Sequence, residues 1–344
     1  MSGLRRTILA WYGRSKRDLP WRRTRDPYAI WVSEIMLQQT RVGTVAPFYE
    51  RFLRRFPDVR ALARAREPAV LAAWSGLGYY RRARNLHAAA RAIVKSGGGF
   101  PRTYETLLEL PGIGGYTAAA IASIAFGEAR AAVDGNVIRV LARLRGFTGR
   151  RDSPALRARV ANLAEAMARG PGPGDWTQAL MELGAVICLP RDPLCDRCPA
   201  ARSCVARKSG NPTRYPEALP LKTPKAERRL LLLASAGERI LVVPDEAEPT
   251  TWSLPWVTIA GSKSIRHAAL ALAGRHVIPA DGIPGPRATF KHRTFSHDLS
   301  YEVWSLRVDV ASRRRSDSRW ATPAQLRKLP LRAPTLKAMR LRGR

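Results

Sequence analysis

Acidic residues are scarce in this chain. Its 344 residues include 27 Asp and Glu against 59 Lys and Arg, which gives a formal net charge of +32. The basic residues run along the whole length instead of forming one tail. Such an excess is typical of proteins that bind a polyanion, with nucleic acid as the first candidate. A general arginine bias of the source proteome is the alternative explanation.

Long apolar runs and dispersed cysteines are also missing. No stretch reaches the roughly 20 apolar residues that a membrane-spanning helix needs. The run at 8–12 is too short for the apolar part of a signal peptide. The four cysteines all fall between 188 and 204, which argues against a disulfide framework. The sequence therefore predicts a cytoplasmic protein that has no membrane partner.

The pattern of apolar residues predicts two domains of different class. Residues 1–207 are expected to be a helical domain, and residues 208–227, with four prolines, a linker. Residues 228–344 are expected to form a smaller α+β domain. The predicted helices of the first domain are 4–12, 27–39, 45–56, 68–73, 82–95, 103–110, 117–126, 154–168 and 176–187. In the second domain we expect strands at 230–233, 240–243 and 299–310, and helices at 265–273 and 323–340.

A Pro-Gly-Ile-Gly turn at 111–114 separates two of these helices. Gly112 and Gly114 permit positive φ and carry no Cβ over the backbone. Their N–H groups and the start of the following helix can face one phosphate. Ile113 is expected to point inward. The turn predicts a helix-hairpin-helix that grips nucleic-acid backbone, although a plain helical hairpin has the same spacing.

Two carboxyl groups are expected in contrasting environments. Asp134 precedes an apolar helical pattern and suits an N-cap, where the helix dipole keeps it ionised. Glu34 lies in a helix that starts at Pro27, and its helical neighbours are mostly apolar, which should raise its pKa. A protonated acid together with an ionised carboxylate that stabilises charge is expected to show such contrasting environments. Taken singly, the alternatives are that Asp134 is only a helix cap and that Glu34 is a solvated surface residue.

All four cysteines lie in one segment, spaced Cys188-x6-Cys195-x2-Cys198-x5-Cys204. Four thiolates within 17 residues suit a metal centre. A structural zinc is the rival, but four-cysteine zinc sites usually show two Cys-x2-Cys pairs and this segment has one. Neighbouring arginines suggest a basic loop laid on DNA. A second segment, 76–86, combines glycines, tyrosines and arginines, and predicts either an aromatic wedge beside phosphates or a turn with core tyrosines.

Residues 4–207 resemble the MutY-type adenine DNA glycosylases, a branch of the helix-hairpin-helix, iron–sulfur glycosylases. The matching segments are Leu19-Pro20-Trp21-Arg22, 31–40, 76–87, the hairpin, Val133-Asp134-Gly135-Asn136-Val137, Asn162-Leu163, 178–184 and the cysteine segment. The resemblance implies a base-excision repair enzyme that removes adenine mispaired with 8-oxoguanine or guanine from duplex DNA. It also implies a 4Fe–4S cluster held by Cys188, Cys195, Cys198 and Cys204.

The resemblance also implies a role for individual residues. Glu34 matches the acid that protonates adenine, Asp134 the carboxylate that stabilises the sugar cation, and Asn136 its water-positioning neighbour. The family lines its adenine pocket at Trp21, Arg22 and Glu182, and inserts side chains into the emptied base pair at Gln38, Gln39 and Tyr79. Gly112 and Gly114 belong to the backbone grip.

The second domain resembles the family's Nudix-like domain, which reads 8-oxoguanine. Residues 294–297 match a Phe-Ser-His loop, so Phe295, Ser296 and His297 are expected to contact the oxidised base. Residues 251–255 stand where the family has a longer glycine-rich segment. The helix at 265–273 contains none of the glutamates of Nudix hydrolases, so we expect no pyrophosphatase activity.

Two other functions stay open at this stage. A bifunctional glycosylase/lyase of the endonuclease III type, acting on oxidised pyrimidines, needs an amine in the hairpin. This chain has Tyr116 there. A non-catalytic iron–sulfur protein that binds or scaffolds DNA needs neither Glu34 nor Asp134, and both are present. We expect a monofunctional, monomeric, nucleoid-associated bacterial enzyme.

Overall fold

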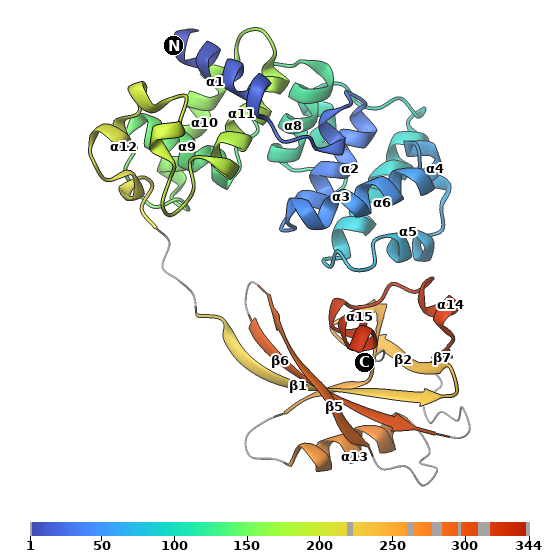
Figure 1. The fold of residues 1–344 in the computed structure, drawn as a ribbon. Coiled ribbons are helices and arrows are strands. Elements are labelled where there is room, and N and C mark those ends of the chain that lie inside the picture. Colours follow the sequence, from blue (N-terminus) through green and yellow to red (C-terminus); the bar gives the residue numbers. More distant parts are fainter. Residues whose placement is uncertain are drawn as a thin grey trace. The chain divides into compact units, whose positions relative to one another are not determined.

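The computed structural model describes residues 2–218, 223–259, 264–276, 284–294, 297–308 and 317–341. Contacts between residues group the chain into two compact units (Figure 1). The first unit, called the helical unit, comprises residues 1–64 and 85–220. The second, called the sheet unit, comprises residues 65–84 and 221–344. The domain boundaries at 207 and 227 remain a prediction.

The helical unit has the class of fold that the sequence predicts. Its helices are α1 (Ser2–Ser15), α2 (Pro27–Leu37), α3 (Val42–Arg55), α4 (Val59–Arg64), α6 (Arg81–Lys95, of which 81–84 count with the sheet unit), α7 (Tyr104–Leu108), α8 (Gly115–Phe126), α9 (Gly135–Arg145), α10 (Pro154–Ala168), α11 (Pro173–Val186) and α12 (Val205–Lys208). The sequence missed α4, which is one and a half turns long. It also placed the end of α2 two residues late, because Gln38 leaves the helix with ψ 114° and Gln39 follows with φ 56°.

The centre of the helical unit is α8, which contacts α2, α7 and α11. Residues 117–124 of α8 are all buried, and most of them are alanine, serine or threonine. Small side chains let the neighbouring backbones come close. A Cβ on Gly174 of α11 would lie 2.7 Å from the Ser123 carbonyl oxygen. A second apolar core joins α1, α9, α10 and α11 around Ile8, Leu141 and Trp176.

The predicted helical hairpin is present between α7 and α8. Thr103 forms a capping box with Thr106 at the start of α7. Gly112 has φ 77°, and Ile113 points inward with 5% of its surface exposed, both as predicted. Gly114 is different. It has φ −96° and ψ 175° and serves as the N-cap of α8, so only Gly112 uses the left-handed region.

The described residues of the sheet unit form one mixed seven-stranded sheet. Its strands are β1 (Lys225–Ala236), β2 (Arg239–Asp245), β3 (Glu248–Ser253), β4 (Trp256–Thr258), β5 (Gly285–Arg293), β6 (His297–Arg307) and β7 (Arg319–Ala321). The order is β3-β2-β1-β6-β5, while β4 pairs with β1 and β7 pairs with β2. The β1–β6 pair is parallel, and Leu230 lies opposite Glu302 in its register. The α+β class is therefore as predicted.

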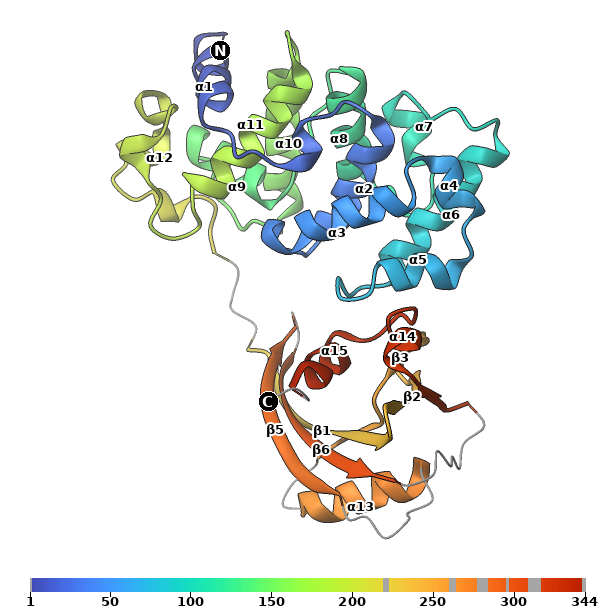
Figure 2. The same cartoon turned by 45° about the vertical axis from the view of Figure 1, so that its right-hand side comes forward.

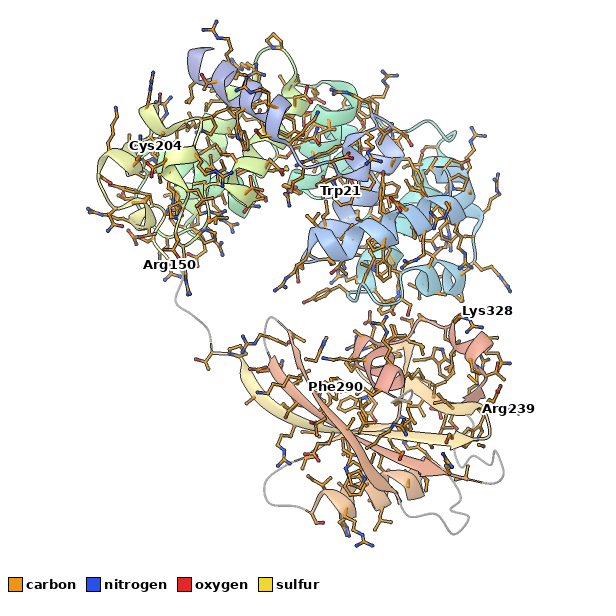
Figure 3. All side chains as sticks on the ribbon, viewed as in Figure 1. Trp21, Arg150, Cys204, Arg239, Phe290 and Lys328 are labelled. Carbon is orange, nitrogen blue, oxygen red and sulfur yellow. The ribbon has the colours of Figure 1, made fainter. Side chains whose placement is uncertain are left out.

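Helices cover both faces of this sheet, as Figures 1 and 2 show. Leu230 and Leu232 face α13 (Ile265–His276), whereas Leu231 and Leu233 face the side of α15 (Ala333–Arg340). An uninterrupted apolar run such as 230–233 is typical of a strand buried on both faces. Phe290, labelled in Figure 3, packs on the α15 side. The unit also contains α5 (Glu67–Ala73) and α14 (Pro323–Leu326).

Two predicted ranges in the carboxy-terminal part differ from the structure. The expected helix 323–340 is split into α14 and α15, and Pro330, which cannot continue a helix, lies between them. The expected linker 208–227 is partly structured. Tyr215 accepts a hydrogen bond from Arg143, the Glu217 N–H donates to the Gly149 carbonyl, and β1 begins at Lys225. In the described parts of the chain, no helix has both the length and the apolar character to cross a membrane.

Substituting Gly112 should disrupt the hairpin, whereas Gly114 should tolerate the same change. An Ala at 112 would hold φ 77° and place its Cβ 2.5 Å from the Asn85 Cβ. Gly112→Ala should therefore lower the free energy of unfolding by about 2–4 kcal/mol. Gly114→Ala, with nothing within 4 Å of the new Cβ, is the matched control. Urea unfolding measures both, and equal losses would contradict the role of Gly112.

Candidate active site

One pocket of the helical unit gathers the four predicted catalytic residues and the three residues predicted to line an adenine pocket. It has a volume of about 300 Å³, at the lower end for ligand pockets. Its walls come from α2, α8, α11, the start of α9 and the segment 17–22. Predicted residues that line it are Trp21, Arg22, Glu34, Tyr116, Asp134, Asn136 and Glu182. Trp21, labelled in Figure 3, packs edge-on against Tyr49, with ring centroids 5.5 Å apart.

Glu34 is an acid whose pKa lies close to neutral pH. Its side chain projects from α2 and 7% of the residue is exposed. The pKa of Glu34 is raised to about 7, mainly by burial and in part by the nearby Asp134 carboxylate. A hydrogen bond with Tyr116 and the charge of Arg22 lower the pKa in part. The prediction of a raised pKa from apolar neighbours is therefore met, with added contributions from residues distant in sequence.

Asp134 is the N-cap of α9, as its sequence position indicates. Its Oδ1 accepts a hydrogen bond of 2.7 Å from the Val137 N–H. Its Oδ2 accepts one of 2.9 Å from the Asn136 side-chain amide. The helix N-terminus adds a favourable dipole. This carboxyl group is held in one orientation at the edge of the pocket and acts as an acceptor through both oxygens.

Glu182 forms the opposite wall of the pocket and is fully buried. Burial alone would raise its pKa, but hydrogen bonds from Arg17 and Arg22 lower the pKa to about 2. The Arg17 Nε donates to Oε1 at 2.8 Å, and the Arg22 guanidinium donates to Oε2 at 2.7 Å. Glu182 is thus a permanent carboxylate, while Glu34 in the same pocket holds a proton. The two environments separate an acid from an anion.

Tyr116 stands on the first turn of α8, at the position where a lyase would need an amine. Burial raises the pKa of Tyr116 well above its ordinary value, and the charges of Glu34 and Asp134 add to this effect. Its hydroxyl lies 3.7 Å from the Met181 sulfur. The phenol therefore stays neutral. It forms a hydrogen bond with Glu34. No lysine is among the residues that line the described pocket.

The four cysteines line a separate small cavity, together with Arg143 and Arg207. All four are half-buried free thiols, and Cys204 is labelled in Figure 3. Burial raises the pKa of Cys198 to about 11, so this thiol is protonated at neutral pH unless a metal binds it. The buried Arg143 guanidinium lies 3.4 Å from the Cys188 sulfur and donates to the carbonyls of Leu189 and Pro190. Four cysteine sulfurs around one cavity are the type of donor that a thiolate-bound metal centre uses.

A hydrogen-bonded series connects this cavity to the pocket. Arg139, on α9, donates from Nε to the Cys188 carbonyl at 2.7 Å. Its terminal nitrogen donates to the Asn136 side-chain oxygen at 2.9 Å and to the Gly184 carbonyl at 2.8 Å. Asn136 in turn donates to Asp134. Asn136 is therefore fixed from both sides, which orients the Asp134 carboxylate.

The predicted wedge residues have a shared backbone feature. Gln39 has φ 56° and Tyr79 has φ 49°. Both side chains are exposed. Gln38, beside them in the prediction, donates to the Thr117 hydroxyl at 3.4 Å. Gln38 and Gln39 follow α2 directly in the helical unit, whereas Tyr79 belongs to the sheet unit.

The predicted reader of the oxidised base lies in the sheet unit and is only partly described. Phe295 and Ser296 lie outside the described residues. His297 begins β6, and its N–H donates to the Thr294 hydroxyl at 2.9 Å. The His297 Nε2 lies 3.9 Å from a carboxylate oxygen of Glu227.

Sequence reasoning missed two arginines that shape the site. Arg17 clamps Glu182, and Arg139 holds Asn136. Arg139 lies three residues after Asn136 and four before the buried Arg143 on one face of α9. This spacing places two side chains together and could have indicated the contact. Arg17 lies in a loop 165 residues from its partner, and no local pattern indicates it.

Comparison with known proteins agrees with this geometry. Residues 32–165 match the family model of the HhH-GPD superfamily base excision DNA repair proteins. The structure of a thermostable thymine-DNA glycosylase superposes with a TM-score of 0.55 at 31% identity, covering 60% of this chain and 96% of that chain. The fold of the helical unit is that of the helix-hairpin-helix base excision repair class.

Sequence relatives identify the family within this class. The adenine DNA glycosylase of Rattus norvegicus is 35% identical over 406 residues, which cover 99% of this chain and 78% of that protein. That of Homo sapiens is 47% identical over 218 residues, 60% of this chain and 40% of that protein. The chain belongs to the adenine DNA glycosylase family.

The raised pKa of Glu34 predicts a pH-dependent stability. The folded protein keeps the proton up to about pH 7, whereas the unfolded chain loses it near the ordinary value of 4.5. The stabilising contribution is complete below about pH 4.5 and is lost as the pH rises through 7. Glu34→Gln should therefore gain stability over the parent between pH 5 and pH 8, by up to about 3 kcal/mol. Urea unfolding at both pH values measures this gain, and an unchanged difference would contradict it.

Proposed function

We propose that this protein hydrolyses the N-glycosidic bond of adenine mispaired with 8-oxoguanine or guanine in duplex DNA. The observation that carries the proposal is the pair of carboxyl groups in one pocket, with Glu34 holding a proton near neutral pH and Asp134 fixed at a helix N-terminus. Family membership supports adenine as the base. The net charge of +32 supports a polyanionic substrate.

The chemical step follows from these two environments. Adenine is flipped out of the duplex, which costs a few kcal/mol and less at a mispair. Glu34 gives its proton to the base, at N7, so that the base leaves neutral. The Asp134 carboxylate then stabilises the positive charge on the sugar, and water completes the hydrolysis. This is glycoside hydrolysis by two carboxyl groups, applied to an N-glycosidic bond.

The remaining residues position DNA and base. Glu182 accepts from Arg17 and Arg22 through both oxygens and so fixes these two arginines beside the space for the base. The N-terminus of α8 behind Gly112 offers free N–H groups and a positive dipole to one phosphate. Gln39 and Tyr79 would replace the flipped base in the stack. In the sheet unit, His297 would contact 8-oxoguanine with Phe295 and Ser296, and so provide the preference over guanine.

The cysteine segment is proposed to hold a 4Fe–4S cluster through Cys188, Cys195, Cys198 and Cys204. The cluster would order the basic loop that carries Arg197 and Arg207, a structural role. The Arg143 donor toward the Cys188 sulfur suits a thiolate ligand, because N–H donors favour its charged form. Zinc is the alternative metal.

The lyase alternative is disfavoured by the hairpin chemistry. A lyase needs an amine that attacks the sugar and forms a Schiff base. Tyr116 occupies that position, and no lysine lies between Lys95 and Lys208. We propose a monofunctional enzyme that acts as a monomer and leaves an abasic site.

Glu34→Gln should abolish adenine release while duplex binding persists. The amide has a similar size but no transferable proton, and loss of a general acid costs about 10²–10⁴ in rate. The assay incubates parent and variant with A·8-oxoguanine, A·G and A·C duplexes. Strand breaks are counted with and without alkali, and borohydride trapping runs in parallel. The variant Glu50→Gln, at an exposed glutamate of α3, is the control.

Breaks in the parent that appear only after alkali, without trapped complex, support the proposal. Direct nicking with stoichiometric trapping would move the protein to the lyase class. A Glu34→Gln variant within a few-fold of the parent would remove Glu34 from the chemistry. Equal rates on A·8-oxoguanine and A·G would contradict reading of the oxidised base by the sheet unit.

Metal analysis should give about four irons per chain in the purified parent. Cys198→Ser should lower the iron content and weaken duplex binding, because the basic loop loses a ligand that shapes it. Ser203→Ala, an exposed hydroxyl one residue from Cys204, is the control that leaves all thiols in place. One zinc without iron would assign the segment to a structural zinc site.

A further inference from the structure

The turn at 76–80 displays one tyrosine and buries the next. Gly76, Gly78 and Tyr79 have φ of 104°, 70° and 49°. The Tyr79 side chain is 48% exposed, whereas Tyr80 is 1% exposed. A residue other than glycine in the left-handed region costs about 1 kcal/mol and persists only where the surroundings hold it. The contacts of the turn within the sheet unit show what holds it.

Both backbone groups of Leu331 are bonded to the flanks of this turn. The Tyr80 hydroxyl donates to the Leu331 carbonyl at 2.6 Å. The Ser75 hydroxyl accepts from the Leu331 N–H at 3.1 Å and lies 3.3 Å from the Leu331 carbonyl. Leu331 is 3% exposed. Burial raises the pKa of Tyr80 to about 12, so its hydroxyl remains a donor at neutral pH.

Leu331 is itself fixed to the sheet. The Trp252 N–H of β3 donates to the Pro330 carbonyl at 2.9 Å, and the Arg332 N–H donates to the Trp252 carbonyl at 3.0 Å. Arg332 also pairs with Glu248 of β3 at 2.7 Å, and Arg84, just beyond the turn, lies 3.7 Å from the same carboxylate. The turn is thus joined through β3, β2 and β1 to β6.

The turn is braced from its own flank as well. The Trp74 indole N–H donates to the Gly78 carbonyl at 3.2 Å. The Arg82 guanidinium donates to the carbonyls of Leu77 and Gly78, each at 3.2 Å, and stacks on the Tyr79 ring at 5.6 Å. These bonds hold the internal shape of the turn. The bonds to Leu331 attach that shape to the sheet.

We propose that Tyr80 and Ser75 are positioning residues that fasten the turn to Leu331, so that the sheet carrying His297 also sets the place of Tyr79. The proposal rests on the proposed function in one respect, the insertion of Tyr79 at the emptied base pair. Contact with the oxidised base and displacement of the adenine then depend on one compact unit. A mispair contacted by His297 would meet the Tyr79 side chain held by the same sheet.

The experiment uses the full chain with Tyr80→Phe and Ser75→Ala. Tyr28→Phe is the matched control, because Tyr28 is equally buried and donates to the Phe56 carbonyl at 2.8 Å in the helical unit. Amide hydrogen exchange of the free protein tests attachment. A duplex with 2-aminopurine beside the target adenine, opposite 8-oxoguanine, reports unstacking by the wedge, and single-turnover adenine release is measured on the same duplex.

Tyr80→Phe should speed amide exchange in residues 76–80 and in Leu331 and Arg332 by about fivefold, the effect of one buried hydrogen bond. The 2-aminopurine signal and the rate of adenine release should fall by a similar factor, and Tyr28→Phe should change none of the three. Ser75→Ala should act in the same direction as Tyr80→Phe.

Each other result overturns part of the proposal. Unchanged exchange in Tyr80→Phe rejects the attachment, whatever the enzyme does. Faster exchange with a fluorescence signal and release rate equal to those of Tyr28→Phe rejects the positioning of Tyr79. A parent that releases no adenine from any duplex rejects the proposed function and the positioning role with it, while hydrogen exchange still decides the attachment.

Discussion

The close packing of α8 against α2 and α11 is the constraint on which the pocket depends. A Cβ on Gly174 would overlap the α8 backbone at Ser123 and Ile124, which shows how near the two helices lie. Helix α8 also contacts α2, and its buried alanines occupy little space there. Glu34 and Glu182, on separate helices, therefore line one small space. Larger side chains on α8 would widen the pocket and admit water, and the environments of both acids would change together.

Burial by itself does not decide the charge of these acids. It raises the pKa of both Glu34 and Glu182. Glu182 receives charged donors from Arg17 and Arg22, which outweigh burial, while Glu34 receives one phenol and faces the Asp134 carboxylate. The number and charge of the donors thus separate the acid from the anion. Arg17 and Arg22 keep Glu182 ionised, whereas Glu34, which no arginine clamps, keeps its proton.

Features that depend on neighbouring residues along the chain could be predicted from the sequence. Contacts between distant segments could not. The cap at Asp134, the positive φ of Gly112 and the buried strand at 230–233 follow from neighbours along the chain, and the structure shows all three. The clamp of Arg17 on Glu182 joins positions 165 residues apart, so no period or spacing announces it. Strand β5 escaped prediction because it is rich in basic residues and only partly buried, although exposed and half-buried residues alternate from 287 to 293.

Backbone strain gives an independent indication of where the fold serves a ligand. Among the described residues, three other than glycine have positive φ, namely Gln39, Tyr79 and Asp192. Gln39 and Tyr79 are exposed, so burial of their side chains does not offset the cost of about 1 kcal/mol each. Backbone strain that side-chain burial does not offset is expected where the surrounding structure holds a residue in position for a partner. Asp192 lies inside the cysteine segment, where the path between Cys188 and Cys195 imposes the turn. The same backbone signature therefore has two origins here, the proposed insertion of Gln39 and Tyr79 into DNA and a loop constrained within the chain.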